Sequence, residues 1–175
     1  DLAIVTVGDI AGLFGIGTSG EGCDVVDLAL PGRQGELLER VLQTGTPTVL
    51  LLVTGRPYAL GDSAARCVAI VQAFMPGVEG AEALADVLTG VTNPSGRLPI
   101  TFPRHAGQLP VYYNQIRGQH GDRYADLTQD PAFAFGEGLT YTTVEYADLT
   151  LAESALSADD TICLLYTSPS PRDQR

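Results

Sequence analysis

The chain has 175 residues, of which 45% are hydrophobic, so it is long enough to bury one sizeable core. Its 21 Asp and Glu against 10 Lys and Arg give a formal net charge of -11, which argues against binding to nucleic acid or to an anionic membrane surface. The negative net charge does not oppose the binding of a neutral ligand such as a carbohydrate. No apolar stretch approaches the roughly 20 residues that a membrane helix needs.

The first part of the chain alternates between strand and helix patterns. Residues 1–7 form a near-continuous apolar run, typical of a strand buried on both faces, and a polar, glycine-rich loop over residues 8–24 follows it. Residues 33–43 place apolar side chains on one helical stripe, and residues 48–53 are a short apolar run of the buried-strand type. A strand, a helix and a strand in this order predict a parallel crossover unit.

The alternation continues to about residue 90. We expect a short helix over residues 62–66, a third strand over the β-branched run 67–74, and a helix over residues 78–88 that is closed by Gly90. This succession predicts an α/β fold with an open, mostly parallel sheet and helices on both faces.

Beyond residue 90 the pattern changes. Residues 93–99 are a turn-dense connector, and residues 100–102 are a short extended piece. Residues 104–133 show little periodicity, and their aromatic content favours an ordered surface loop. Residues 139–146 and 149–151 alternate like antiparallel strands.

These changes predict three parts. We expect the α/β domain to cover residues 1–140 and the truncated start of an all-β domain to cover residues 141–162. Residues 163–175 resemble a translated sequencing adapter, and we expect this tail not to be native; a natural Pro- and Ser-rich tail is the alternative.

The chain begins without Met and inside a predicted strand, so we expect it to be a fragment. The compartment, cytoplasmic or secreted, is therefore left open. Cys23, Cys67 and Cys163 show no metal-ligand spacing and are odd in number. Small buried thiols are the simplest interpretation of these cysteines.

The glycine-rich loop contains the acids Asp9, Glu21 and Asp24. Its glycines do not fit the pattern of a phosphate-binding loop, and its acids would repel phosphate, so a nucleotide site is not favoured. A carboxylate on such a loop suits a general acid, because glycines allow close backbone approach. From the residues alone, the more common role is that Glu21 and Asp24 bind turn amides.

A series of short motifs runs through the chain in a fixed order. They are Val-Gly-Asp to Leu-Pro-Gly (7–32), Thr-Gly-Arg-Pro (54–57), Phe-Met-Pro-Gly-Val-Glu-Gly (74–80), Asn-Pro-Ser-Gly-Arg-Leu-Pro (93–99), Tyr-Tyr-Asn (112–114) and Phe-Gly-Glu-Gly-Leu-Thr-Tyr (135–141). Together they resemble the ordered motifs of glycoside hydrolase family 3, the β-glucosidase and β-xylosidase family. Each motif is weak alone, but the series is highly specific.

The resemblance implies a retaining hydrolase of several domains. In that family an N-terminal barrel supplies an Asp nucleophile, the α/β sandwich supplies an acid/base glutamate, and a fibronectin type III-like domain often follows. Glu21 occupies the position that matches the acid/base glutamate. The nucleophile lies outside this chain, so the barrel is the expected partner, and the fragment should be inactive alone.

The expected substrate is a carbohydrate with a terminal β-linked glucose, and xylose is the second choice. No metal or organic cofactor is expected. A non-catalytic carbohydrate-binding module on the same fold is the alternative to an enzyme.

Other polar residues have less certain roles. Asp9 stands where many family members have Glu, and Val25 stands where an aromatic residue or Arg often follows the loop Asp. Asp9 and Asp24 could therefore contact substrate, orient the loop or cap a turn. Arg56 could bind an anionic group or form a buried salt bridge.

The long loop offers further candidates. We expect Arg123 and Tyr124 to contact substrate, because sugars stack on aromatic rings and bond to charged groups. Arg117, His120 and Asp122 could line the same subsite. His105 and His120 lack a metal-like spacing and are expected to be surface or hydrogen-bonding residues.

Overall fold

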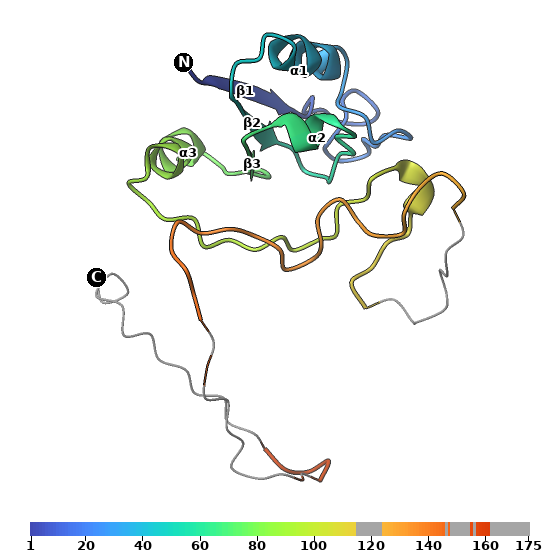
Figure 1. Ribbon diagram of the computed structural model, residues 1–175. Helices are drawn as coiled ribbons and strands as arrows, with labels where there is room; N and C mark the ends of the chain where they lie inside the picture. The colour runs from blue at the N-terminus through green and yellow to red at the C-terminus, as the bar shows by residue number, and fades with distance from the viewer. Residues whose placement is uncertain (115–123, 146, 148–154, 156, 162–175) are drawn as a thin grey trace. The chain divides into compact units, whose positions relative to one another are not determined.

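Three parallel strands form a sheet within residues 1–142: β1 (Ala3–Gly8), β2 (Thr48–Val53) and β3 (Ala69–Gln72), in the order β1-β2-β3 (Figure 1). The computed structural model describes residues 1–114, 124–145, 147, 155 and 157–161. Residues 1–142 form one compact unit, and a second unit begins at Thr143.

The middle strand, β2, is the most buried. Every residue from Thr48 to Leu52 is buried, as expected for an apolar strand that has neighbours on both edges and cover on both faces. Its pairing with β1 runs from Ala3 opposite Thr48 to Gly8 opposite Val53. The carboxyl ends of the two strands therefore lie side by side.

The first strand, β1, is covered on one face only. Val5 and Val7 are buried, whereas Ile4 is 52% exposed. The prediction that this strand is buried on both faces is wrong for this chain, because only the side chains that face the core cluster are covered.

The core forms between β1, β2 and the helix α1 (Gln34–Leu42). Its buried members are Val5, Val7, Leu38, Leu42, Leu50 and Leu52. The predicted helix over residues 33–43 is confirmed, and its apolar stripe is the face that packs on the sheet. Burial of apolar area of this kind is the main stabilising contribution to the fold.

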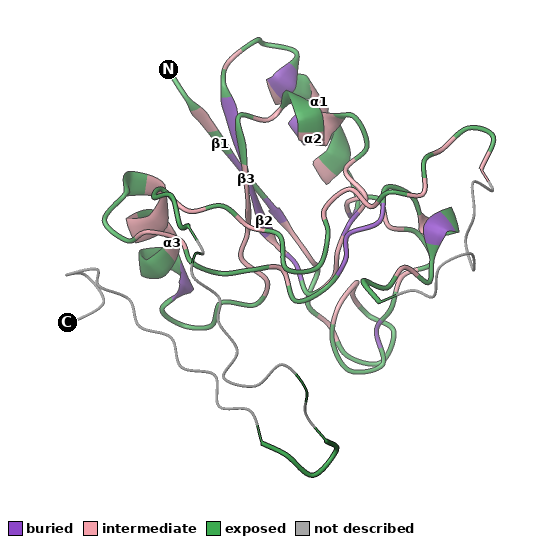
Figure 2. Ribbon diagram, turned by 60° about the horizontal axis from the view of Figure 1, so that its bottom comes forward, coloured by how far each residue is buried: buried purple, intermediate pink, exposed green. Residues whose placement is uncertain are grey.

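The remaining helices follow the predicted alternation. Helix α2 (Ser63–Arg66) contacts α1, and Figures 1 and 2 show these two helices on one side of the sheet and α3 (Gly80–Thr89) on the other. The prediction of helices on both faces is confirmed. Gly90, with a φ of 79°, ends α3 in the left-handed conformation that helix termini favour.

The third strand is shorter than predicted. We expected it over residues 67–74, but β3 ends at Gln72. Phe74 has a φ of 53°, a left-handed conformation that cannot continue a strand. The apolar run continues past the point where the backbone turns away.

Beyond residue 90 the described chain has little regular structure. Phe102 forms an isolated antiparallel bridge with Phe133, and residues Ala106–Gln108 form a 3-10 turn, η1. The strand predicted over 139–146 is absent from 139–145, because the Tyr141 N–H donates to the Asn93 side chain (2.7 Å) rather than to a neighbouring strand. Residue 146 and the strand predicted over 149–151 lie outside the described residues.

Candidate functional site

The glycine-rich loop, residues 8–24, starts from a fixed point at the carboxyl ends of β1 and β2. Gln34, the first residue of α1, binds both backbone groups of Gly8: its side-chain oxygen accepts from the N–H (2.6 Å), and its side-chain N–H donates to the carbonyl (2.8 Å). The Asp9 N–H then donates to the Val53 carbonyl (3.1 Å). In open α/β sheets, ligands collect at this edge.

Backbone hydrogen bonds join the two arms of the loop. The Gly12 N–H donates to the Ser19 carbonyl (3.0 Å), and the Phe14 N–H donates to the Glu21 carbonyl (2.8 Å). Since each bond spans seven residues of chain, the loop is a folded structure with its own internal partners, and the backbone of Glu21 is one of them.

Two glycines make this folding possible. A Cβ atom at Gly12 would lie 1.2 Å from the Ile16 carbonyl oxygen, and one at Gly20, which has a φ of 137°, would lie 1.9 Å from the Gly12 carbonyl oxygen. The expectation that glycines permit close backbone approach therefore holds within the loop itself, where backbone packs against backbone.

Glu21 is the loop acid that is left available. Its side chain is exposed and makes no hydrogen bond or ion pair with any residue that the structure describes. Because its main chain is held and its carboxylate is not, Glu21 can present that group to a ligand without breaking an internal contact.

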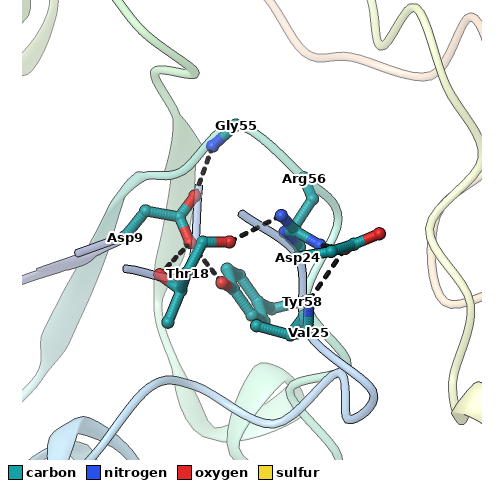
Figure 3. Close-up of polar contacts among 7 residues, drawn as sticks. All are labelled: Asp9, Thr18, Asp24, Val25, Gly55, Arg56 and Tyr58. Atoms are coloured by element: carbon teal, nitrogen blue, oxygen red, sulfur yellow. Dashed lines mark hydrogen bonds and ion pairs between the residues drawn. The ribbon is translucent and has the colours of Figure 1, made fainter. Parts of the chain in front are cut away.

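Asp9, in contrast, has both carboxylate oxygens occupied. Oδ1 accepts from the Thr18 hydroxyl (2.8 Å) and from the Tyr58 hydroxyl, and Oδ2 accepts from the Gly55 N–H (2.7 Å) (Figure 3). Burial first, and then the hydrogen bond to Asp9, raise the pKa of Tyr58 above its ordinary value, so the phenol stays protonated and can donate.

Asp24 is bound by Arg56. An Arg56 Nη1–H donates to Asp24 Oδ1, and Nη2–H donates to the Thr18 carbonyl (2.6 Å) (Figure 3). The Arg56 contact, followed by a hydrogen bond from the Val25 N–H, lowers the pKa of Asp24. Asp24 in turn raises the pKa of Arg56. The Arg56 side chain is 21% exposed and that of Asp24 85%. Arg56 therefore forms a salt bridge, but the expectation that this salt bridge is buried is wrong, because Asp24 lies on the exposed side of the loop.

Sequence reasoning missed three members of this cluster: Thr18, Gly55 and Tyr58. They lie on two segments that follow adjacent strands, because Thr18 belongs to the loop after β1, and the other two follow β2. The signal that would have found them is the parallel pairing, which brings the segments after both strands to one edge.

Of the substrate-contact candidates in the long loop, Tyr124 falls within the described residues. The Tyr124 hydroxyl donates to the Gly107 carbonyl (2.8 Å), so its polar group has an internal partner. Arg123, together with Arg117, His120 and Asp122, lies outside the described residues. The His105 ring accepts from the Gly107 N–H (3.0 Å) and caps the 3-10 turn, consistent with a hydrogen-bonding role.

A surface hollow of about 450 Å³ lies beside the end of the glycine-rich loop. Its lining residues are Thr18, Asp24–Asp27 and Ala29–Gly32. Glu21 does not line it. The walls around Glu21 must therefore come from elsewhere if this residue acts on an enclosed ligand.

No other chemical group stands out among the described residues. Cys23 is buried, and burial raises the pKa of the half-buried Cys67; both are free thiols, and Cys163 is outside the described part. Within that part, no three His, Cys, Asp or Glu side chains gather where they could hold a metal ion. None of its helices is long and apolar enough to cross a membrane.

Comparison with known proteins places these observations in a family. Residues 1–141 match the model of the glycosyl hydrolase family 3 C-terminal domain. The chain is 36% identical over 169 residues to a periplasmic β-glucosidase of Salmonella typhimurium, covering 91% of this chain and 21% of that one. It is 38% identical over 151 residues to a β-xylosidase of Formosa agariphila, covering 82% of this chain and 20% of that one.

Similar solved structures include two β-glucosidases, in agreement with this family match. A β-glucosidase involved in saponin metabolism from intestinal bacteria superimposes with a TM-score of 0.71 at 49% identity, over 82% of this chain and 20% of that one. The β-glucosidase of Listeria innocua in complex with glucose gives a TM-score of 0.71 at 31% identity, over 81% of this chain and 20% of that one. The chain thus spans about a fifth of the length of the relatives it matches.

Proposed function

This chain belongs to glycosyl hydrolase family 3, and we propose that it supplies the acid/base glutamate, Glu21, of a β-glycosidase whose nucleophile lies outside these 175 residues. The observation that carries the proposal is the contrast among the loop acids. Asp9 and Asp24 are bound by neighbouring side chains, whereas the Glu21 carboxylate is exposed and unpartnered within the described chain.

The proposed chemistry is a double displacement. A carboxylate from the barrel attacks the anomeric carbon while protonated Glu21 donates its proton to the departing oxygen, which leaves a covalent glycosyl-enzyme. Ionised Glu21 then takes a proton from water, and the resulting hydroxide equivalent releases the sugar with its original anomeric configuration. No step needs a metal or an organic cofactor.

We further propose terminal β-linked glucose as the substrate, with xylose second. The names of relatives support both sugars: a periplasmic β-glucosidase and a β-xylosidase match this chain with similar identity. Comparing kcat/KM for aryl β-glucosides and aryl β-xylosides separates the two choices. A preference for the xyloside would reverse our order.

The domain division is also a proposal. We infer that residues 1–140 are the α/β sandwich, that residues 141–162 begin a fibronectin type III-like domain, and that residues 163–175 are not native. The family match over residues 1–141 and the compact unit that ends at Thr142 support the first boundary. Sequencing the gene beyond codon 162 tests the last one.

The test of Glu21 uses a complete enzyme that joins this chain to a family 3 barrel. Glu21→Ala should slow glycosides with poor leaving groups by about 100- to 10,000-fold and activated aryl glycosides far less at the first step, because only the former need protonation. Glu82→Ala, which removes an exposed carboxylate on α3, is the matched control and should leave both rates unchanged.

Two outcomes would contradict the proposal. Equal losses on both kinds of substrate would make Glu21 a structural residue and would favour the non-catalytic carbohydrate-binding alternative. Measurable hydrolysis by the 175 residues alone would show that the chain contains its own nucleophile.

A further inference from the structure

Arg56 holds the segment that contains Glu21 at both of its ends. Its guanidinium donates to the carbonyl of Thr18 and to the carboxylate of Asp24, which lie three residues before and three residues after Glu21. Arg56 itself follows β2, so the two contacts connect the loop after β1 to the neighbouring strand across sequence separations of 38 and 32 residues.

Backbone hydrogen bonds to the Ser19, Glu21 and Gly22 carbonyls join the segment between these contacts to the other arm of the loop, but they do not connect it to the sheet. The segment contains Gly20 and Gly22, both with positive φ, and glycine loses more conformational freedom on ordering than any other residue. A planar guanidinium that binds two groups in fixed directions can restrict such a segment, whereas an ammonium is a single point charge.

A second set of contacts fixes the end of the segment that Arg56 holds at Thr18. The Thr18 hydroxyl donates to Asp9 and accepts from the Ile10 N–H (2.8 Å), and Asp9 is held in turn by the Tyr58 hydroxyl and the Gly55 N–H. Tyr58 is 2% exposed, so its ring is locked by packing. The polar cluster in Figure 3 therefore connects the buried Tyr58, which follows β2, through Asp9 and Arg56 to Thr18 and Asp24, the two ends of the segment that contains Glu21.

We propose that Arg56 and Tyr58 are positioning residues for Glu21, acting through Thr18, Asp9 and Asp24, and that Asp9 and Asp24 serve the reaction in this way. The inference rests on the proposed acid/base role of Glu21. It assigns a function to the segment after β2, residues 54–58, which holds the glycine-rich loop in position. A proton donor must be held within a fraction of an ångström of its acceptor, and a misplacement of about 1 Å costs on the order of 100-fold in rate.

The decisive variant is Arg56→Lys in the complete enzyme, because lysine keeps the charge but cannot bind both ends of the segment. We expect kcat for poor leaving groups to fall by about 10- to 100-fold with KM within about twofold, since the loss falls on the transition state. Hydrogen exchange of the backbone amides of residues 18–24 should become faster, while that of β2 stays unchanged. Arg66→Lys, at a surface pair with Glu39 on the helices, is the matched control and should change neither quantity.

A double variant separates positioning from general stability. If Arg56 acts through Glu21, then Arg56→Lys in a Glu21→Ala background should cause less than about a twofold further loss, because coupled residues are not additive. Fully additive losses, or equal losses for good and poor leaving groups, would overturn the proposal and leave Arg56 a structural residue.

Tyr58→Phe keeps the inference testable if the arginine variant does not fold. It removes one hydroxyl and keeps the buried ring, and we expect a smaller fall in kcat, about 3- to 10-fold, with the same dependence on the leaving group.

The exchange measurement distinguishes this inference from the proposed function. If Arg56→Lys leaves hydrogen exchange in residues 18–24 unchanged, Arg56 does not position this segment, whichever residue is the acid. If exchange becomes faster in Arg56→Lys but the losses in Glu21→Ala do not depend on the leaving group, the proposed function is refuted. Residues 54–58 would then position the loop without a role in catalysis.

Discussion

Two irregular regions of this chain are ordered in opposite ways. In the glycine-rich loop, residues 8–24, backbone hydrogen bonds join the two arms, the polar side chains of Asp9, Thr18 and Asp24 are bound, and bulky apolar side chains such as Phe14 (78% exposed) point outward. In the connection formed by residues 101–108 and 124–133, side chains are the anchors: Phe102 is 2% exposed, and the buried Gln108 side chain donates to the carbonyls of Thr128 (2.9 Å) and Asp130 (3.3 Å).

The difference shows how irregular chain can serve two purposes. A loop whose two arms are joined by backbone hydrogen bonds can leave a side chain such as that of Glu21 free for chemistry. In a connection that is fixed through its side chains, those side chains are buried in packing contacts. Phe102 is an example: its ring packs edge-on against that of Phe133, with 6.1 Å between the ring centroids. We therefore expect function in the first region and support in the second.

The largest expected effect compares the two phenylalanines. Phe102→Ala should lower the free energy of unfolding by about 3–5 kcal/mol, because it leaves a cavity, whereas Phe14→Ala should change it by less than about 0.5 kcal/mol. Urea unfolding of the 175-residue chain measures both. Similar losses for the two variants would mean that the glycine-rich loop also depends on its apolar side chains.

The next largest effect is the difference in stability between alanine substitutions at two glycines. Gly12→Ala forces a backbone shift, because its Cβ would meet the Ile16 carbonyl, and should cost about 1–3 kcal/mol and expose the loop amides to hydrogen exchange. Gly96→Ala, in the turn before the second region, has open space around its Cβ and an ordinary φ, so a change within about 0.5 kcal/mol is expected. If the loop amides of Gly12→Ala exchanged hydrogen at the same rate as those of the unsubstituted chain, close backbone packing would not be what orders the loop.

A smaller effect tests the buried amide of the second region. Gln108→Ala leaves the Arg104 N–H and two carbonyls without their side-chain partner, and should destabilise the chain by about 1–2 kcal/mol. Tyr124→Phe, which removes one exposed hydrogen bond to Gly107, should cost about 0.5 kcal/mol at most. Thermal unfolding of both variants gives the ranking, and the reverse order would remove Gln108 as the anchor.

The smallest effect is electrostatic and belongs to the first region. Because Arg56 lowers the pKa of Asp24, the contribution of this pair to stability is present above the ordinary pKa of an aspartate, about 3.9, and is lost as the pH falls through the lowered value. NMR titration of the Asp24 carboxyl should give a pKa below the ordinary value, and Arg56→Gln should move it back up. A pKa that does not respond to Arg56→Gln would mean that the pair does not persist in solution.

Much of the fold follows from local patterns. Strand β1, helix α1, strand β2 and helix α3 lie where apolar patterns predicted them, because these patterns reflect which faces of each element are covered. The short helix α2 also lies where it was expected, although it has no buried residue. The path of residues 139–145 was not predictable in this way, since alternation alone cannot show that Asn93 would take the Tyr141 N–H. The left-handed conformation at Phe74 likewise gives no signal in composition.

The sequence by itself determined the α/β class, the family and the identity of Glu21 as the candidate acid, because strand and helix periods are local and the motifs of the family keep their order along the chain. Only the tertiary structure decided which loop acid is free. Tyr58 meets Asp9 across 49 residues and Arg56 meets Asp24 across 32, and the parallel pairing of β1 with β2 is what brings these partners to one edge of the sheet. Contacts at such separations depend on which residues the paired strands bring to the same edge of the sheet, and the periodicity of a single segment does not show this.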